Sequence, residues 1–160
     1  MPSLGGESSV GETEVWLTPP YILDALGEFD LDPCSPLGRP WDTAKNHYTV
    51  EDDGLVQPWY GRIWLNPPYG RAMTPWLEKM ANYDGGGVAL VFARTETRNF
   101  QELIFPYADA ILFLRGRLAF HRPDGSQAQT AQAPSVLIAY GEQEIDALEK
   151  SGLDGKLVRL

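Results

Sequence analysis

IWLNPPY, at residues 63–69, places a short apolar run directly before a rigid polar turn. Ile63 to Leu65 predicts a buried strand, and the prolines end it because neither has an N–H to donate. Val88 to Ala93 is a continuous apolar run of the kind found in strands buried on both faces. Amphipathic helix patterns separate such runs, so the sequence predicts an α/β fold with a parallel-type sheet and helices on its faces.

The other elements are expected from apolar spacing and from cap and turn residues. Thr18 is interpreted as the N-cap of a first helix that continues through Pro19 and Pro20 and ends near Gly27. Further helices are expected from Thr74, from Thr95 or Thr97, and over residues 142–150. Further strands are expected at residues 29–34, around 47–50, at 110–114 and at 135–140, with a long polar excursion at 115–134.

The composition is that of one globular domain. With 160 residues, of which 43% are hydrophobic, the chain can bury a core of its own. Cys34 is the single cysteine, which excludes an intramolecular disulfide and favours a reducing compartment, so we expect a cytoplasmic protein. No apolar run approaches the ~20 residues that span a bilayer, so we expect no membrane association. Residues 1–14 are interpreted as a flexible tail and residues 15–160 as the domain.

The distribution of charge bears on a nucleic-acid partner. The net charge is −9, yet residues 61–122 hold 8 basic and 5 acidic side chains. Arginine suits bidentate contacts with phosphate, although a mixed-charge surface explains the same pattern. An acidic protein binds DNA weakly and with strong salt dependence. The candidate phosphate contacts are Arg71, Arg94, Arg98, Arg117 and Arg122.

The turn at residues 66–69 suits the recognition of a planar ring that carries an amino group. The Asn66 side-chain oxygen and the Pro67 carbonyl can each accept a hydrogen bond from such an amine and orient its lone pair. Pro67 and Pro68 hold the local backbone rigid. Tyr69 offers a ring face for stacking, worth ~1–3 kcal/mol per base. An ordinary proline-rich turn closing a strand is the alternative.

Several short segments occur in an order that resembles one enzyme family. From about Trp16 to Tyr140 the chain is similar to the phage- and prophage-type DNA N-6-adenine methyltransferases. NPPY alone is less specific, because methylases of RNA and of protein glutamine share it. The segments are WxTPP at 16–20, LDPC at 31–34, DDGL at 52–55, NPPY at 66–69, ARTET at 93–97 and GRLxF at 116–120.

The resemblance implies a minimal Rossmann-like class I methyltransferase domain, with S-adenosylmethionine as methyl donor and a flipped adenine of double-stranded DNA as acceptor. A homodimer is left open, and the modification would protect a phage genome from restriction. Asn66, Pro67, Pro68 and Tyr69 match the catalytic motif. By the same resemblance Asp32 faces the cofactor ammonium, and Asp53, or else Asp52, accepts from the cofactor adenine. The full set of expected cofactor contacts is Trp16, Thr18, Pro19, Asp32, Pro33, Cys34, Asp53 and Leu55.

Simpler structural roles compete with several of these assignments. Asp32 also suits a strand-end turn, Thr18 a helix cap, and Cys34 a small buried residue. Trp16 and Trp64 suit core positions. No catalytic role is assigned to either histidine, and one cysteine with two scattered histidines predicts no metal site.

The sequence differs from the family pattern at two points, which concern the binding of the cofactor and of DNA. SPLGRP, at residues 35–40, replaces the expected glycine-rich loop, so the cofactor must be held differently. No separate module for reading DNA is visible, and residues 115–134 are either that reader or a disordered surface loop. Rival functions are methylation of RNA adenine or protein glutamine, and nucleic-acid binding without catalysis.

Overall fold

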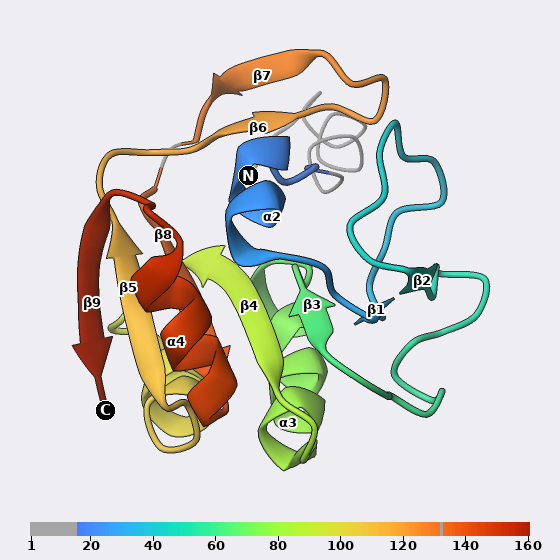
Figure 1. Ribbon diagram of the computed structural model, residues 1–160. Coiled ribbons are helices and arrows are strands. Elements are labelled where there is room, and N and C mark those ends of the chain that lie inside the picture. Colours follow the sequence, from blue (N-terminus) through green and yellow to red (C-terminus); the bar gives the residue numbers. More distant parts are fainter. Residues whose placement is uncertain (1–15, 132) are drawn as a thin grey trace.

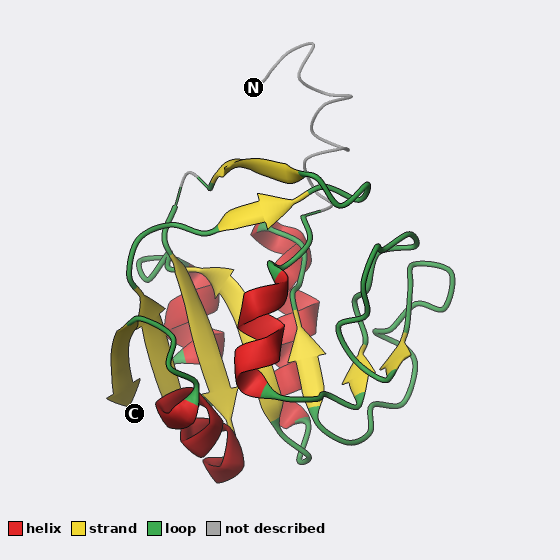
Figure 2. Cartoon of the chain, turned by 45° about the horizontal axis from the view of Figure 1, so that its top comes forward, coloured by secondary structure: helices red, strands yellow, loops and turns green. Residues whose placement is uncertain are grey.

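The computed structural model describes residues 16–131 and 133–160, so the expected tail at residues 1–14 lies outside the described residues. The large sheet has seven strands in the order β2-β1-β3-β4-β8-β5-β9. Helices cover both faces of this sheet, and a separate hairpin lies across one end (Figures 1 and 2). The α/β, Rossmann-like architecture expected from the sequence is confirmed.

Most elements begin and end close to the predicted residues. The helices are α2 (Pro20–Leu26), α3 (Thr74–Asn82) and α4 (Glu142–Lys150), with a 3-10 turn η1 (Gly70–Met73) and a π-helix η2 (Asn99–Ile104). The strands of the large sheet are β1 (Leu31–Asp32), β2 (Asn46–His47), β3 (Ile63–Leu65), β4 (Gly87–Phe92), β5 (Ala110–Leu114), β8 (Ser135–Tyr140) and β9 (Gly155–Arg159). The strands predicted at residues 63–65, 110–114 and 135–140 are confirmed to the residue.

The core is divided by the sheet into two layers. All six residues of β8, and all but the last residue of β4, are buried, as their continuous apolar runs predict. Helices α2 and α4 pack on one face through Ile22, Leu26, Ile145 and Leu148. Helices α3 and η2 pack on the other through Leu77, Met80, Phe100 and Ile104.

The expectation of a parallel-type sheet holds for only part of it. Strands β2, β1, β3 and β4 pair in parallel, whereas β8 runs antiparallel to both of its neighbours, β4 and β5. Among the described residues, no helix carries the chain back across the sheet between β5 and β8. The chain therefore re-enters the sheet at the end of the strands where β5 finishes, and β8 runs in the opposite direction to β5.

The interpretation of residues 115–134 as a disordered loop was wrong. β6 (Ala119–His121) and β7 (Gln127–Thr130) form an antiparallel hairpin, visible at the top of Figure 1. The hairpin buries Leu118, Phe120 and Ala128, and β6 also forms a bridge with Leu17. These strands were not predicted from the sequence because the second one, QAQT, is mostly polar.

Thr18 does not cap α2, in contrast to the prediction. The N-cap is Pro19, without a side-chain hydrogen bond, and Pro20 occupies the first helical position. The Thr18 hydroxyl lies instead 3.4 Å from the amide nitrogen of Asn66. The Thr18 hydroxyl, which the local sequence pattern assigned to capping α2, therefore contacts Asn66 in a distant segment instead.

A buried ion pair ties α4 to the start of β3. Arg62 donates from Nε and Nη2 to both carboxylate oxygens of Glu144, at 2.7 to 3.0 Å, and its guanidinium lies 4.1 Å from the ring centre of Phe29. The Glu144 side chain is only 4% exposed, so water competes little for this carboxylate.

Glu144→Gln is expected to lower the free energy of unfolding by about 2 kcal/mol, because Arg62 would keep its place with its charge uncompensated. Denaturant unfolding measures the change. The matched control is Glu142→Gln on the same helix, where the carboxylate is 81% exposed and pairs with Arg159. This control should change stability by less than about 0.5 kcal/mol. Equal effects of the two variants would contradict the structural role of the buried pair.

Candidate active site

The connections of β1 mark the point at which an α/β sheet of this kind binds ligands. The chain leaves β1 for β2 on one side and later enters β3 on the other, so the strand order reverses at β1. Ligands bind at the carboxyl ends of strands beside such a switch point. A cavity of about 510 Å³ lies there. Ten of the predicted residues line it: Trp16, Thr18, Asp32, Pro33, Cys34, Asp53, Asn66, Pro67, Pro68 and Tyr69.

Asn66 follows β3 directly and is held by a segment distant in sequence. Its Nδ2 donates to the Trp16 carbonyl, at 3.3 Å, and to the Thr18 hydroxyl, at 3.4 Å. Both amide hydrogens are thereby used, and Oδ1 accepts no hydrogen bond from any residue that the structure describes. The side chain thus presents a free acceptor at a cavity wall.

Tyr69 lies between the cavity and an aromatic cluster. Its ring stacks on Phe92, at the carboxyl end of β4, with centroids 4.6 Å apart and planes 9° apart. Phe92 in turn meets the edge of Phe120, from the hairpin strand β6. Burial raises the pKa of the Tyr69 phenol to about 12, so this group stays protonated at neutral pH. Tyr69 can therefore stack and donate, but it cannot serve as a base.

Asp32 places a buried carboxylate in the cavity wall at the end of β1. The carboxylate accepts hydrogen bonds from the Cys34 N–H, at 3.1 Å, and from the Thr43 hydroxyl. Burial raises its pKa to about 6, although the two hydrogen bonds and Arg39 act in the opposite direction. Burial, and then Asp32, raise the pKa of the neighbouring Cys34 thiol to about 12, so the thiol stays protonated. A buried carboxylate with no ion pair among the described residues suits a cationic ligand.

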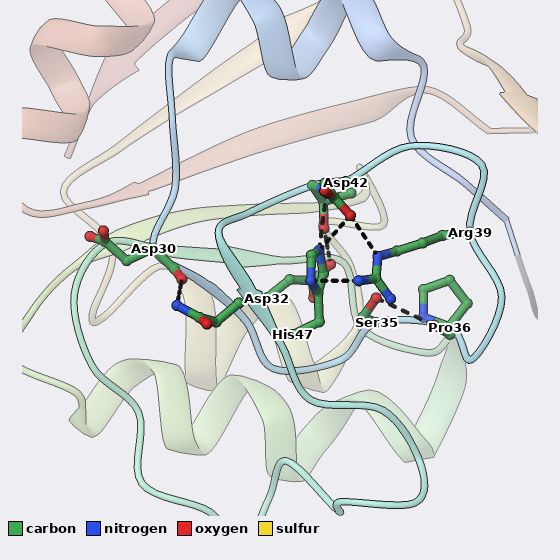
Figure 3. Close-up of polar contacts among 9 residues, drawn as sticks. Asp30, Asp32, Ser35, Pro36, Arg39, Asp42 and His47 are labelled. Carbon is green, nitrogen blue, oxygen red and sulfur yellow. Dashed lines mark hydrogen bonds and ion pairs between the residues drawn. The ribbon is translucent and has the colours of Figure 1, made fainter.

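The loop between β1 and β2 has its own polar framework in place of a glycine-rich turn. Figure 3 shows Arg39 and Asp42 of this loop beside His47 of β2. Arg39 donates to Asp42 Oδ1, at 3.3 Å, and contacts His47 Nδ1, at 2.8 Å. Burial, and then Arg39, lower the pKa of His47, which keeps the ring neutral as an acceptor. The Thr43 N–H donates to His47 Nε2, at 3.3 Å, so the same framework holds the residue whose hydroxyl donates to Asp32.

The DDGL segment approaches the first loop closely. Of the two aspartates there, Asp53 lines the cavity, whereas the Asp52 carboxylate accepts from the Thr49 N–H, at 2.8 Å, and from its hydroxyl. Gly54 lies against the Pro33 carbonyl, and a Cβ at this position would overlap that oxygen. Only glycine permits this approach, which joins the two predicted cofactor segments in one wall.

Pro19 and Leu55, both predicted cofactor contacts, do not line the cavity. Pro19 is buried at the start of α2. The Leu55 carbonyl accepts from Lys79 Nζ on α3, at 2.8 Å, so Leu55 helps to anchor the loop behind Asp53. Residues that the sequence analysis did not assign to the site but that line the cavity are Leu17, Ser35, Pro36, Thr43, Thr49, Val50, Gly54, Trp64 and Trp76. Among these residues, Gly54 could have been predicted from the sequence, because it belongs to the DDGL segment that already supplied Asp53.

The candidate DNA-binding arginines come from different connections between strands. Arg71 follows β3, and Arg94 and Arg98 follow β4, at the carboxyl ends of strands that pair in parallel. Arg117 lies between β5 and the hairpin strand β6. Arg94 and Arg98 are exposed but form ion pairs with Glu96, at 3.5 Å, and Glu102, at 2.9 Å. Within the described residues, neither Arg71 nor Arg117 forms an ion pair. Arg122 lies at the hairpin turn, where it donates to the Gln127 carbonyl, at 3.0 Å.

The histidines, possible metal ligands and apolar helices of the described residues lie as follows. Neither His47 nor His121 lines the cavity. Residues 16–131 and 133–160 contain no cluster of three or more histidine, cysteine, aspartate or glutamate side chains that could hold a metal ion. None of the helices described is long and apolar enough to cross a membrane.

A family model covers the part of the chain that forms the cavity. The family model described as DNA N-6-adenine-methyltransferase (Dam) matches residues 7–150. The chain belongs to the Dam family. The matched range spans residues 16–120, on which the resemblance was based, and both strands of the hairpin. A comparison of the chain with curated proteins finds no significant match.

Proposed function

We propose that this Dam-family protein transfers a methyl group from S-adenosylmethionine to N6 of an adenine flipped out of double-stranded DNA. The observation that carries the proposal is the Asn66 amide, which is tied back through its nitrogen and leaves its oxygen free in a cavity at the topological switch point. A biological role in protecting phage DNA from restriction is part of the proposal and rests on the family resemblance.

The cavity suits the proposed methyl donor in size and in charge. Its volume of about 510 Å³ falls within the ~300–1,000 Å³ of small-molecule sites. Asp32 supplies a buried carboxylate for the ammonium group, and Asp53 an acceptor for the adenine amine. The close contact of Gly54 with Pro33 brings these two subsites into one wall. When bound, S-adenosylmethionine supplies an electrophilic methyl group on a positively charged sulfur.

The residues of the turn at 66–69 would act mainly by positioning and electrostatics. Asn66 Oδ1 and the Pro67 carbonyl accept hydrogen bonds from the two N6 hydrogens and turn the nitrogen lone pair toward the methyl group. The same oxygens stabilise the positive charge that develops on nitrogen. The alkylated amine is acidic and loses its proton to water, so no strong base is required. Tyr69 stacks on the flipped ring.

DNA would lie along the edge of the sheet that carries the cavity and the arginines. N6 is unreachable inside a duplex, and flipping the base requires about a few kcal/mol. Arg71, Arg94, Arg98, Arg117 and Arg122 are the proposed phosphate contacts, and the β6–β7 hairpin is the proposed reader of the flanking bases. With so small a reader, sequence preference is short or is completed by a second subunit in a homodimer.

Tyr69→Phe is expected to retain methyl transfer within about threefold of the parent, whereas Tyr69→Ala should lose about tenfold or more, because stacking requires the ring. Steady-state transfer to DNA measures both. Both variants should bind S-adenosylhomocysteine like the parent. A severe defect in the Phe variant would assign the role to the hydroxyl instead of the ring face.

Affinity for the cofactor is expected to fall by about tenfold per pH unit below about pH 6, since protonated Asp32 no longer attracts an ammonium group. The stability of the fold depends on pH in the opposite direction. The folded-state pKa of Asp32 is raised above 3.8, so ionisation of this carboxyl disfavours the folded state. This unfavourable contribution decreases as the pH falls below about 6 and is gone below the unfolded value of 3.8. Calorimetric titration with S-adenosylhomocysteine gives the affinity. Asp32→Asn should remove the pH dependence, and a variant that keeps it would exclude Asp32 as the titrating group.

The direct test of function is incubation with labelled S-adenosylmethionine and, separately, with random-sequence DNA, RNA or ribosomal protein. We expect label in DNA, recovered as N6-methyldeoxyadenosine after digestion to nucleosides. Label mainly in RNA adenine or in protein glutamine would replace the proposed acceptor. Binding of the donor without transfer to any of the three would indicate a module that does not catalyse.

A further inference from the structure

The orientation of the Asn66 amide depends on a segment about fifty residues earlier in the chain. Its Nδ2 faces the Trp16 carbonyl and the Thr18 hydroxyl. A carbonyl only accepts hydrogen bonds, so a reversed amide would bring two oxygens together at 3.3 Å. The Trp16 carbonyl therefore decides which end of the amide faces the segment at residues 16–18.

The peptide that carries this carbonyl is itself fixed from the opposite side. The Leu17 N–H, which belongs to the same planar peptide, donates to the His121 carbonyl at 2.8 Å. The His121 N–H donates back to the Leu17 carbonyl at 3.0 Å. Leu17 is 5% exposed and Thr18 is 2% exposed, so water has little access to these groups. Strand β6 of the hairpin thus holds the peptide that orients the proposed catalytic amide.

The Thr18 hydroxyl takes no part in capping the helix that follows it. It lies outside α2, whose N-cap is Pro19 and has no side-chain hydrogen bond. The hydroxyl accepts from Asn66 instead, and the side chain is almost fully buried beside the cavity. A burial of this kind is favourable only when the hydroxyl has a partner, and the partner here is the Asn66 amide.

We propose that Thr18 is a positioning residue, which together with the Trp16 carbonyl holds the Asn66 amide with its oxygen available to the substrate amine. The inference rests on the proposed function and extends it, because Thr18 acts through Asn66 and requires no contact with the reacting atoms. The competing role is direct contact with the cofactor, since Thr18 also lines the cavity.

Thr18→Val removes the oxygen and keeps the volume, and Thr18→Ser keeps the oxygen. We expect Thr18→Val to lower kcat by about 10- to 100-fold with an unchanged Kd for S-adenosylhomocysteine, and Thr18→Ser to restore kcat to within about threefold of the parent. Thermal unfolding of both variants identifies any general loss of folding. A parental kcat combined with a weakened Kd in the Val variant would assign Thr18 to the cofactor and overturn the proposal. A Ser variant as slow as the Val variant would overturn it too.

A second measurement does not depend on turnover. The side-chain NH₂ resonances of Asn66 can be assigned by their absence from the Asn66→Asp spectrum. In Thr18→Val we expect these protons to exchange with water about tenfold faster than in the parent, because one hydrogen bond is lost. Equal exchange would contradict the proposal even if the parent protein methylates no DNA, and faster exchange would support it in the same case. Failure of the proposed function and failure of the positioning role are thereby separated.

Discussion

Asn66→Ala is expected to lower the rate of methyl transfer to DNA by about 10²- to 10³-fold. The reason is the loss of the one side-chain oxygen that we assign to the amine during reaction. The affinity for S-adenosylhomocysteine should not change, because the carboxylates assigned to that ligand, Asp32 and Asp53, come from other segments. Single-turnover rates and calorimetric titration measure the two quantities separately.

The matched control is Asn82→Ala. Asn82 ends α3, and its Nδ2 donates to the Glu78 carbonyl at 2.9 Å, so it resembles Asn66 in type but does not line the cavity. Its replacement should leave the rate within about twofold of the parent. An Asn66→Ala protein that transfers methyl groups as fast as this control would remove Asn66 from the mechanism.

Gly54→Ala is expected to weaken binding of S-adenosylhomocysteine by about tenfold or more and to lower stability by about 1–3 kcal/mol. The added Cβ would overlap the Pro33 carbonyl and would also lie 3.2 Å from the Trp76 side chain. A backbone oxygen cannot move aside by changing rotamer, so the DDGL segment must separate from the LDPC loop. The same movement would part Asp53 from Asp32.

Gly38→Ala serves as the control for this prediction. Gly38 lies in the loop after β1, two residues beyond the cavity residue Pro36, and a Cβ there would meet no atom within 4 Å. Its replacement should change neither affinity nor stability measurably. If the two alanine variants bind S-adenosylhomocysteine equally well, the close approach of the two loops has no part in forming the site.

The sequence predicted those elements of the fold whose residues are buried on both faces. Ile63 to Leu65 and Ser135 to Tyr140 lie in the middle of the sheet, and continuous apolar runs indicate such strands directly. Strand β9 lies at the sheet edge with Leu157 alone half-buried, so no apolar run indicates it. The direction of β8 could not be predicted, because direction depends on the connection and not on the strand.

The site was predictable to the extent that its motifs follow parallel strands. LDPC contains β1 and the two residues after it, and NPPY follows β3. The carboxyl ends of these adjacent parallel strands lie side by side. The contacts that shape the cavity are of another kind. The approach of Gly54 to Pro33 and the hydrogen bond of Asn66 to Trp16, across 50 residues, depend on the folded chain. Thr18 shows the difference well, since a local rule predicted a helix cap and the structure shows a partner for Asn66.

A crystal structure with S-adenosylhomocysteine tests the central claim most directly. We predict that the ligand lies in the cavity between the ends of β1 and β3, with its ammonium at Asp32, its adenine amine at Asp53 and its sulfur toward Asn66. A ligand bound outside this cavity, or one whose sulfur lies away from Asn66, would contradict the account.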